Sequence, residues 1–196
     1  MGPREATIKR KTDETKIEIS LNIEGTGKTG INTGIPFLNH MLNLFARHGL
    51  FDLTIVAKGD LEVDEHHTVE DVGISLGQAF RQALGDKTGI HRYGDSIMPM
   101  DESLVMVAVD ISGRPHLIYD MQLPARKTGQ FDTSLIVEFL HAFVNHAAIT
   151  LHLKMLSGRN THHIIEGAFK GIAVALREAC ATDPRVIGVP STKGEL

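Results

Sequence analysis

The sequence predicts an internally duplicated fold of mixed strands and helices, in which each half runs strand, strand, helix, strand, helix. Two observations predict it. The same succession of strand-like and helical segments occurs twice along the 196 residues. A His-His-x-x-Glu motif also occurs twice, each time at the start of the last helix of a half. With 42% hydrophobic and 22% charged residues, the composition is that of a globular protein with a proper core.

The first half is predicted to span residues 1–92. Alternating segments at 6–11 and 16–23 flank a polar turn and predict two strands. The Gly/Thr-rich stretch 25–34 is predicted to be a loop. Pro36 then opens a helix that runs through His48 and is closed by Gly49. Residues 51–57 predict a strand, and residues 66 to about 84 predict a second helix with one apolar side.

The second half is predicted to span residues 93–182 and to repeat this order. Residues 104–112 and 116–123 are predicted strands, 133–146 an apolar helix, 149–155 a strand and 162–181 a long helix. Residues 124–132 are predicted to form an exposed loop. The tail, residues 183–196, is rich in Pro, Gly and Ser and would be disordered unless other parts of the protein hold it.

The residues themselves support the duplication. A shift of 96 positions places His66, His67 and Glu70 on equivalent residues of the second motif. Six identities fall in the 19 positions compared, against roughly one expected from ordinary composition. Two unrelated amphipathic helices would explain shared Ala and Arg residues but not the same motif twice. Duplication is therefore the better interpretation.

The repeated motif indicates a metal site. On a helix, Glu70 shares a face with His66 and with His67, because the residues are four and three positions apart. The two neighbouring imidazoles diverge by about 100° and can therefore reach two ions. We expect two metals, each taking ligands from both motifs. Imidazole with carboxylate suits Mn, Fe, Co, Ni or Zn. The alternative is that the paired histidines are helix caps or surface residues, which two matched copies make a poorer explanation.

The rest of the sequence narrows the class of protein. A formal net charge of −4 gives no basic face for nucleic acid. No apolar run has membrane-spanning length, and the first residues lack a signal-peptide core. The single cysteine, Cys180, suits a reducing compartment. We therefore expect a cytoplasmic protein without nucleic-acid or membrane partners.

Four stretches carry a specific family resemblance. They are FLNHML at 37–42, DEHHTVED at 64–71, GRNTHHIIE at 158–166 and PSTKG at 190–194. With them, essentially the whole chain resembles the imidazoleglycerol-phosphate dehydratases of histidine biosynthesis. The resemblance implies an α+β fold with helices packed on one face of each duplicated sheet (ribosomal protein S5 domain 2-like). It also implies a homo-oligomer of 24 subunits, with active sites at subunit contacts and two Mn²⁺ per site.

The same resemblance assigns an activity and metal ligands. The enzyme would be a hydro-lyase that dehydrates D-erythro-imidazole glycerol phosphate to imidazole acetol phosphate. Glu138 departs from the family, in which many members carry His at that position, and it lies 98 residues after its counterpart His40. The metal ligands implied are His40, His66, His67, Glu70, Glu138, His162, His163 and Glu166.

A phosphate site is also implied by the resemblance. Guanidinium and ammonium groups suit a phosphate dianion, although a solvated surface charge is the alternative for each. Lys170 lies two helical turns after His162 on the same predicted helix. The tail, 183–196, would contribute to the active site through Thr192 and Lys193. The substrate- and phosphate-binding residues implied are Glu14, His48, Arg92, Arg114, Lys170, Thr192 and Lys193.

The chemistry requires removal of a proton from a carbon with no adjacent carbonyl. We expect the two metals to hold the substrate ring as imidazolate, whose electrons expel the hydroxyl and give a diazafulvene-like intermediate. A carboxylate then shuttles the proton, with Glu14, Glu70 and Glu166 as the catalytic candidates. Glu14 matches an acidic family position, although it could instead be an ordinary turn residue. The pair Asp101 and Glu102 is interpreted either as a turn or as support for a metal ligand.

Two other functions use the same ligands. A non-catalytic metal-storage assembly would not need the basic residues, so Arg92→Ala would discriminate between the two by its effect on turnover at intact metal content. A dinuclear hydrolase is disfavoured because the Asp-rich motifs of phosphatases are missing.

Overall fold

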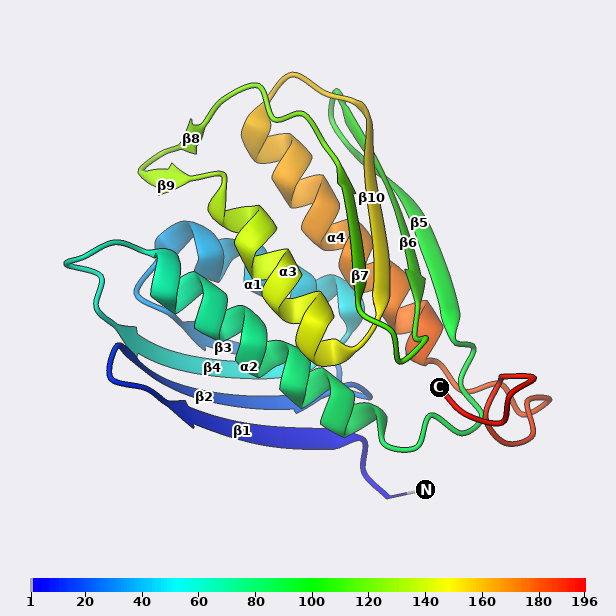
Figure 1. Cartoon of the computed structure of the whole chain (residues 1–196). Helices are drawn as coiled ribbons and strands as arrows, with labels where there is room; N and C mark the ends of the chain where they lie inside the picture. Colours follow the sequence, from blue (N-terminus) through cyan, green and yellow to red (C-terminus); the bar gives the residue numbers. More distant parts are fainter. Residues whose placement is uncertain (1) are drawn as a thin grey trace.

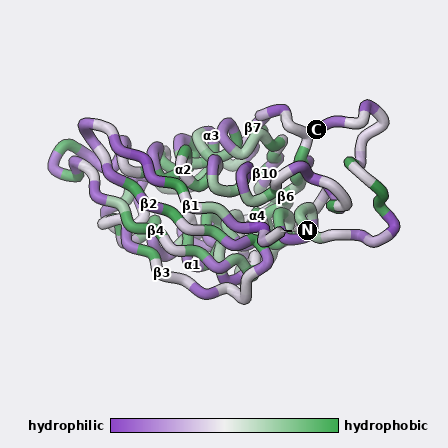
Figure 2. The backbone as a smooth tube through the Cα atoms, turned by 90° about the horizontal axis from the view of Figure 1, so that it is seen from below, coloured by the Kyte–Doolittle hydropathy of each residue, from purple (hydrophilic) through white to green (hydrophobic). Residues whose placement is uncertain are grey.

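The computed structural model describes residues 2–196 and contains two four-stranded sheets with four helices between them (Figure 1). The first sheet is formed by β1 (Glu5–Lys11), β2 (Thr15–Asn22), β3 (Thr29–Asn32) and β4 (Asp52–Gly59), in the order β1-β2-β4-β3. The inward side chains of β2 alternate with outward polar ones, as a sheet covered on one face requires. This alternation is visible from below in Figure 2. The α+β class is confirmed.

The second sheet repeats the topology of the first. It contains β5 (Tyr93–Met100), β6 (Ser103–Asp110), β7 (His116–Asp120) and β10 (Thr150–Ser157), in the order β5-β6-β10-β7. In each sheet the first two pairs of neighbouring strands are antiparallel. The last pair, β4–β3 or β10–β7, is parallel. A small hairpin, β8 (Lys127–Thr128) and β9 (Phe131–Asp132), precedes the helix that follows β7.

The four helices pack across the two halves. They are α1 (Pro36–Gly49), α2 (His66–Leu84), α3 (Leu135–Ala147) and α4 (Thr161–Cys180). Helix α1 packs against α4, and α2 packs against α3, so each pair joins one helix from before and one from after residue 92. Phe45, Phe80 and Phe143 meet between them with ring centroids about 6 Å apart. One continuous apolar core therefore serves both sheets.

Glycines allow the close approach of α2 to α3. A Cβ atom at Gly77 would lie 2.5 Å from the carbonyl oxygen of Phe143, and one at Gly73 would lie 2.7 Å from that of Phe139. Because the opposing atoms belong to the backbone of α3, they cannot move aside as a side chain would.

Three details of the expected element order were wrong. Strand β3 lies inside the segment predicted to be a loop, and β5 was not predicted, so three strands of each four-stranded sheet come before the first long helix of the half. Strand β3 has only four residues, which is too short for an alternating pattern. Strand β5 contains Gly94 and Pro99, and it tolerates the proline because it is an edge strand. The segment 124–132 contains the β8–β9 hairpin and buries Phe131 against Phe37.

The tail, 183–196, is held against the rest of the chain. The N–H of Gly89 donates to the carbonyl of Gly188 at 2.8 Å, and the N–H of Asp183 donates to the carbonyl of Gly89 at 2.9 Å. In addition, the guanidinium of Arg92 donates to the carbonyl of Pro190 at 2.9 Å. No helix within residues 2–196 is both long enough and apolar enough to cross a membrane.

Candidate metal centre

Helices α1 and α4 bring three possible metal ligands together. Oε2 of Glu166 lies 3.2 Å from Nε2 of His40 and 3.2 Å from Nε2 of His162. One ligand atom from each residue lies within 4.8 Å of the others, and this is the one such group of three or more within residues 2–196. His162 and Glu166 share a face of α4 because they are four residues apart. The side chain of Asn160 caps this helix by accepting hydrogen bonds from the N–H groups of His162 and His163.

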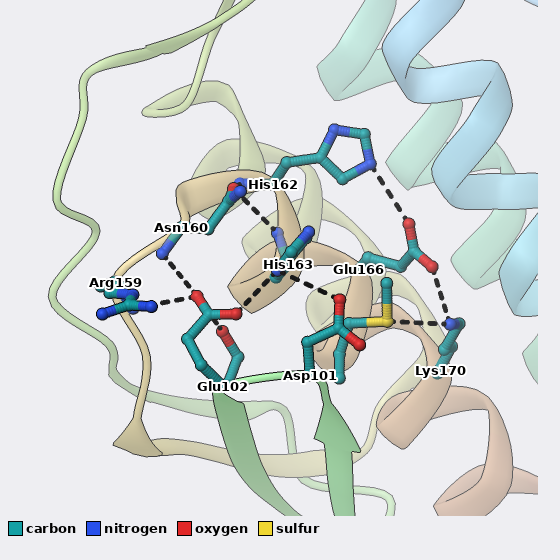
Figure 3. A network of polar contacts seen from close by, with 10 residues as sticks. Asp101, Glu102, Arg159, Asn160, His162, His163, Glu166 and Lys170 are labelled. Atoms are coloured by element: carbon teal, nitrogen blue, oxygen red, sulfur yellow. Dashed lines mark hydrogen bonds and ion pairs between the residues drawn. The ribbon is translucent and has the colours of Figure 1, made fainter.

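Glu166 is buried and ionised. Burial raises its pKa, but hydrogen bonds from Lys170, His40 and His162 outweigh this effect and hold the pKa below its usual range. Oε1 accepts from Nζ of Lys170 at 2.7 Å, whereas Oε2 faces the imidazoles of His40 and His162. Figure 3 shows the contacts with Lys170 and His162. The arrangement therefore offers two imidazole nitrogens and one carboxylate oxygen to a single cation.

A cavity of about 420 Å³ adjoins this centre. His40 and His162 line one side, and the turn between β8 and β9 lines another. The ring of Phe37 stands edge-on to the imidazole of His162, with centroids 5.3 Å apart. A small ring-shaped molecule would thus find apolar walls and two imidazoles at one end.

The first motif forms a looser group. Nε2 of His66 lies 3.8 Å from Oε2 of Glu70, and the carboxylate of Asp64, two residues before α2 begins, accepts a hydrogen bond from the N–H of His66. Glu138 lies exposed in the first turn of α3, and its side chain makes no ion pair or hydrogen bond within residues 2–196. This chain by itself does not bring the three together as it does His40, His162 and Glu166.

His67 and His163, the second histidines of the two motifs, each have Nδ1 bound to a carboxylate. Nδ1 of His67 lies 2.9 Å from Oδ2 of Asp60, and Nδ1 of His163 lies 2.8 Å from Oε2 of Glu102. These hydrogen bonds raise the pKa of each histidine, and the bond from His163 lowers the pKa of Glu102 to about 2. Glu14, in the β1–β2 turn, lies 3.7 Å from the other ring nitrogen of His67, Nε2.

The residues expected to bind phosphate make different contacts in this chain. Lys170 lies at the metal centre, where it pairs with Glu166. Burial and then the charge of Lys170 lower the pKa of His48. Arg92 forms two hydrogen bonds with Asp110, at 2.8 and 3.2 Å, and reaches the tail through Pro190.

Three other expected residues remain on the surface. Arg114 follows β6 and is exposed, and Thr192 and Lys193 are exposed in the tail.

Sequence reasoning missed two carboxylates that contact functional candidates, Asp60 and Asp110, because neither belongs to a motif. Glu102 was named but left undecided between a turn and a supporting role. The available signal was weak: each lies at the end of a predicted or observed strand, where polar residues are common. Asp110 is 18 residues from its partner Arg92, and Glu102 is 61 residues from its partner His163. Only the tertiary structure shows these pairings.

Comparison with known proteins shows the family. The model of the family described as imidazoleglycerol-phosphate dehydratase matches residues 33–176. The chain is 58% identical over 193 residues to the imidazoleglycerol-phosphate dehydratase of Pelobacter propionicus, covering 98% of this chain and 99% of the relative. It is 55% identical over 197 residues to that of Acidithiobacillus ferrooxidans, covering 100% and 99%.

Solved structures agree with this assignment. The imidazoleglycerol-phosphate dehydratase of Staphylococcus aureus superposes with a TM-score of 0.84 at 41% identity, covering 91% of this chain and 99% of that chain. The corresponding structure from Pyrococcus furiosus gives 0.83 at 41% identity, covering 96% and 100%.

The fold and the histidine–carboxylate centre define an enzyme of the mixed α+β class with a possible metal site. The chain belongs to the imidazoleglycerol-phosphate dehydratase family. It is accordingly a hydro-lyase of histidine biosynthesis.

Proposed function

We propose that this chain dehydrates D-erythro-imidazole glycerol phosphate to imidazole acetol phosphate in a metal-dependent reaction. The observation that supports metal dependence most directly is the placement of His40, His162 and Glu166, whose ligand atoms lie within 4.8 Å of one another. A buried carboxylate with two imidazoles is a donor set that fits Mn²⁺ and other first-row cations.

Two Mn²⁺ ions per active site are proposed, one of them at this centre. Three protein donors would leave positions of an octahedral shell open for substrate and for donors from another subunit. His66, Glu70 and Glu138 are proposed for the second ion, and Nε2 of His67 and Nε2 of His163 would complete the two shells. Because the two groups are separate in one chain, the proposal requires a homo-oligomer, with 24 subunits as the expected size and the cytoplasm as its location.

The residues of this chain would act on a substrate whose ring enters the 420 Å³ cavity. When bound, the metal ions would act as Lewis acids that hold the imidazole ring as imidazolate. Ring electrons would expel the neighbouring hydroxyl group, which would take a proton from a carboxylic acid and leave as water. The remaining diazafulvene-like intermediate would have an acidified C–H bond. The carboxylate would then remove that proton, and the enol formed would rearrange to the ketone.

Glu14 is the proposed proton-transfer group. Its side chain is half exposed in a turn, and Oε1 lies 3.7 Å from Nε2 of His67. The carboxylate is therefore next to a proposed metal ligand and remains accessible. Glu166 and Glu70 remain ligands with secondary proton-transfer roles. Phosphate binding is proposed for Arg92, Arg114, Thr192 and Lys193 of the oligomer, with Lys170 and His48 nearer the ring.

Metal analysis combined with an assay tests this function. The purified oligomer should contain about two Mn²⁺ per subunit when loaded. It should form imidazole acetol phosphate, lose that activity on removal of metal with EDTA, and regain it with Mn²⁺. Light scattering on the same sample should give the 24-subunit mass. Undiminished turnover by a metal-free protein, or a fully active monomer, would contradict the proposal.

A further inference from the structure

The two halves hold the second histidine of each motif in the same way but from different segments. Nδ1 of His163 donates to Glu102 in the β5–β6 turn, and Nδ1 of His67 donates to Asp60 just after β4 (Figure 3 shows the first pair). Asp60 and Glu102 do not occupy equivalent positions in the two halves. The turn of the first half that is equivalent to β5–β6 is β1–β2, and it carries Glu14 instead.

Both carboxylates are committed to these contacts. Glu102 also accepts from the backbone N–H groups of Asn160 at 2.8 Å and Arg159 at 3.3 Å, which fixes it against the start of α4. The side chain of Asp60 has no hydrogen-bond partner other than His67 within residues 2–196, and its second oxygen, Oδ1, is buried without one. The imidazole of His67 is thus the one side-chain partner of Asp60 within residues 2–196, whereas Glu102 both contacts His163 and holds the backbone before α4.

The direction of the hydrogen bond decides what the other ring nitrogen can do. If Nδ1 carries the proton that the carboxylate accepts, Nε2 keeps its lone pair and can bind a cation. A carboxylate partner also fixes the ring plane and raises the ligand strength of the free nitrogen.

We propose that Asp60 and Glu102 are positioning residues that fix His67 and His163 as Nε2 ligands, and that Asp60 thereby leaves Glu14 free for proton transfer. This inference rests on the proposed metal-dependent function. The division of roles follows from position: Glu102 takes the Nδ1 side of its histidine, whereas Glu14, in the equivalent turn, stands at the Nε2 side of His67. One hairpin orients a ligand, and the other presents a reacting group.

Mn²⁺ affinity of the metal-stripped oligomer is the test, read as free Mn²⁺ by electron paramagnetic resonance during titration. Asp60→Ala and Glu102→Ala should each weaken binding about 10- to 100-fold. Asp60→Asn and Glu102→Gln keep an acceptor for Nδ1–H and should recover part of that loss. These two conservative variants also preserve the test if an alanine variant does not fold.

Matched controls are available beside each residue. Glu62→Gln changes an exposed carboxylate of the same β4–α2 loop, and Asp101→Asn changes the neighbour of Glu102, whose nearest oxygen is 3.9 Å from the imidazole. Both should bind Mn²⁺ as the unmodified protein does. Glu14→Gln should also bind Mn²⁺ normally, yet lose about 10²- to 10⁴-fold in kcat at saturating Mn²⁺.

The outcomes separate this inference from the function it rests on. If the unmodified protein binds no Mn²⁺, the proposed function fails. If it binds Mn²⁺ and turns over, but Asp60→Ala and Glu102→Ala bind with the same affinity, the positioning role is wrong. A weaker affinity accompanied by an equally lowered Tm of the metal-free variant would show a structural role instead. Weakened Mn²⁺ binding by Glu14→Gln would overturn the division of roles.

Discussion

The two oxygens of Glu166 have different neighbours, and this difference shapes the centre. Oε1 is occupied by the ammonium of Lys170, whereas Oε2 faces the imidazoles of His40 and His162. Lys170 therefore compensates the buried charge while leaving one oxygen free for a cation. The i, i+4 spacing along α4 produces both contacts, which is why a sequence pattern could predict His162 and Glu166 together.

Asp52, far from this centre, allows a prediction about pH. Hydrogen bonds from the backbone N–H groups of Lys28 and then Thr26 hold the pKa of Asp52 below its usual value. The charged form therefore stabilises the fold above the unfolded pKa of about 3.9, and this stabilisation is lost as pH falls through the lower folded pKa.

Replacing Asp52 with Asn keeps the acceptor oxygen and removes the charge. We expect the Tm of Asp52→Asn, measured without metal, to be lower than that of the unmodified protein near pH 7, and the difference to vanish as the pH falls below about 4. Asp95→Asn is the control, because Asp95 is exposed on β5 and its side chain accepts no hydrogen bond within residues 2–196. A Tm difference for Asp52→Asn that grew at acidic pH would refute this explanation.

Helices and strands with strong periodicity could be predicted, and weak ones could not. The helices that begin at Pro36 and His66 were found within a residue of their ends, because apolar stripes mark both and a proline marks the start of the first. Gly49, which was expected to close the first helix, is its last residue, and Leu50 takes the left-handed C-cap position. Strand β3 and strand β5 were missed because edge pairing, rather than an alternating pattern, keeps them in the sheet. Asp60 was missed for a related reason. Its role depends on the loop between β4 and α2, which brings its carboxylate to Nδ1 of His67.

The close contact between α2 and α3 should make the stability of the fold sensitive to a larger side chain at Gly77. Gly77→Val would place a branched side chain against the backbone of α3. Its Cβ atom alone would lie 2.5 Å from the carbonyl oxygen of Phe143. We expect a loss of about 2–3 kcal/mol in the free energy of unfolding, because overpacking forces the helices apart. Gln78→Ala, at the next and partly exposed position, should change it little. Denaturant titration measures both, and equal stability of the two variants would disprove the close-packing argument.

At the scale of the whole molecule, Arg92 joins the second sheet to the tail. Its guanidinium is held by Asp110 of β6 and donates to the carbonyl of Pro190, two residues before Thr192. Part of its donor set remains free for an anion, so the tail and a phosphate could be organised by one side chain.

Removing this link should loosen the tail without emptying the metal centre. In Arg92→Ala we expect faster hydrogen exchange at residues 186–196, a raised KM and an unchanged Mn²⁺ content. The guanidinium contacts the tail, and the backbone N–H of Arg92 donates to the carbonyl of Ala179 near the end of α4, whereas the ligands His162 and Glu166 lie near the start of that helix. Exchange at residues 36–49 serves as the internal control. Unchanged tail exchange would show that other contacts hold it, and loss of Mn²⁺ would show that the two regions are coupled.

The pairing of α1 with α4 has a consequence for how such a protein could arise from a shorter ancestor. A polypeptide ending near residue 92 would carry His40 but neither His162 nor Glu166, and a polypeptide starting there would carry the reverse. Neither fragment could chelate a cation with these three donors by itself. An unfused ancestor would therefore have needed to associate as a pair before it could hold metal at this position, and fusion would have made that association permanent.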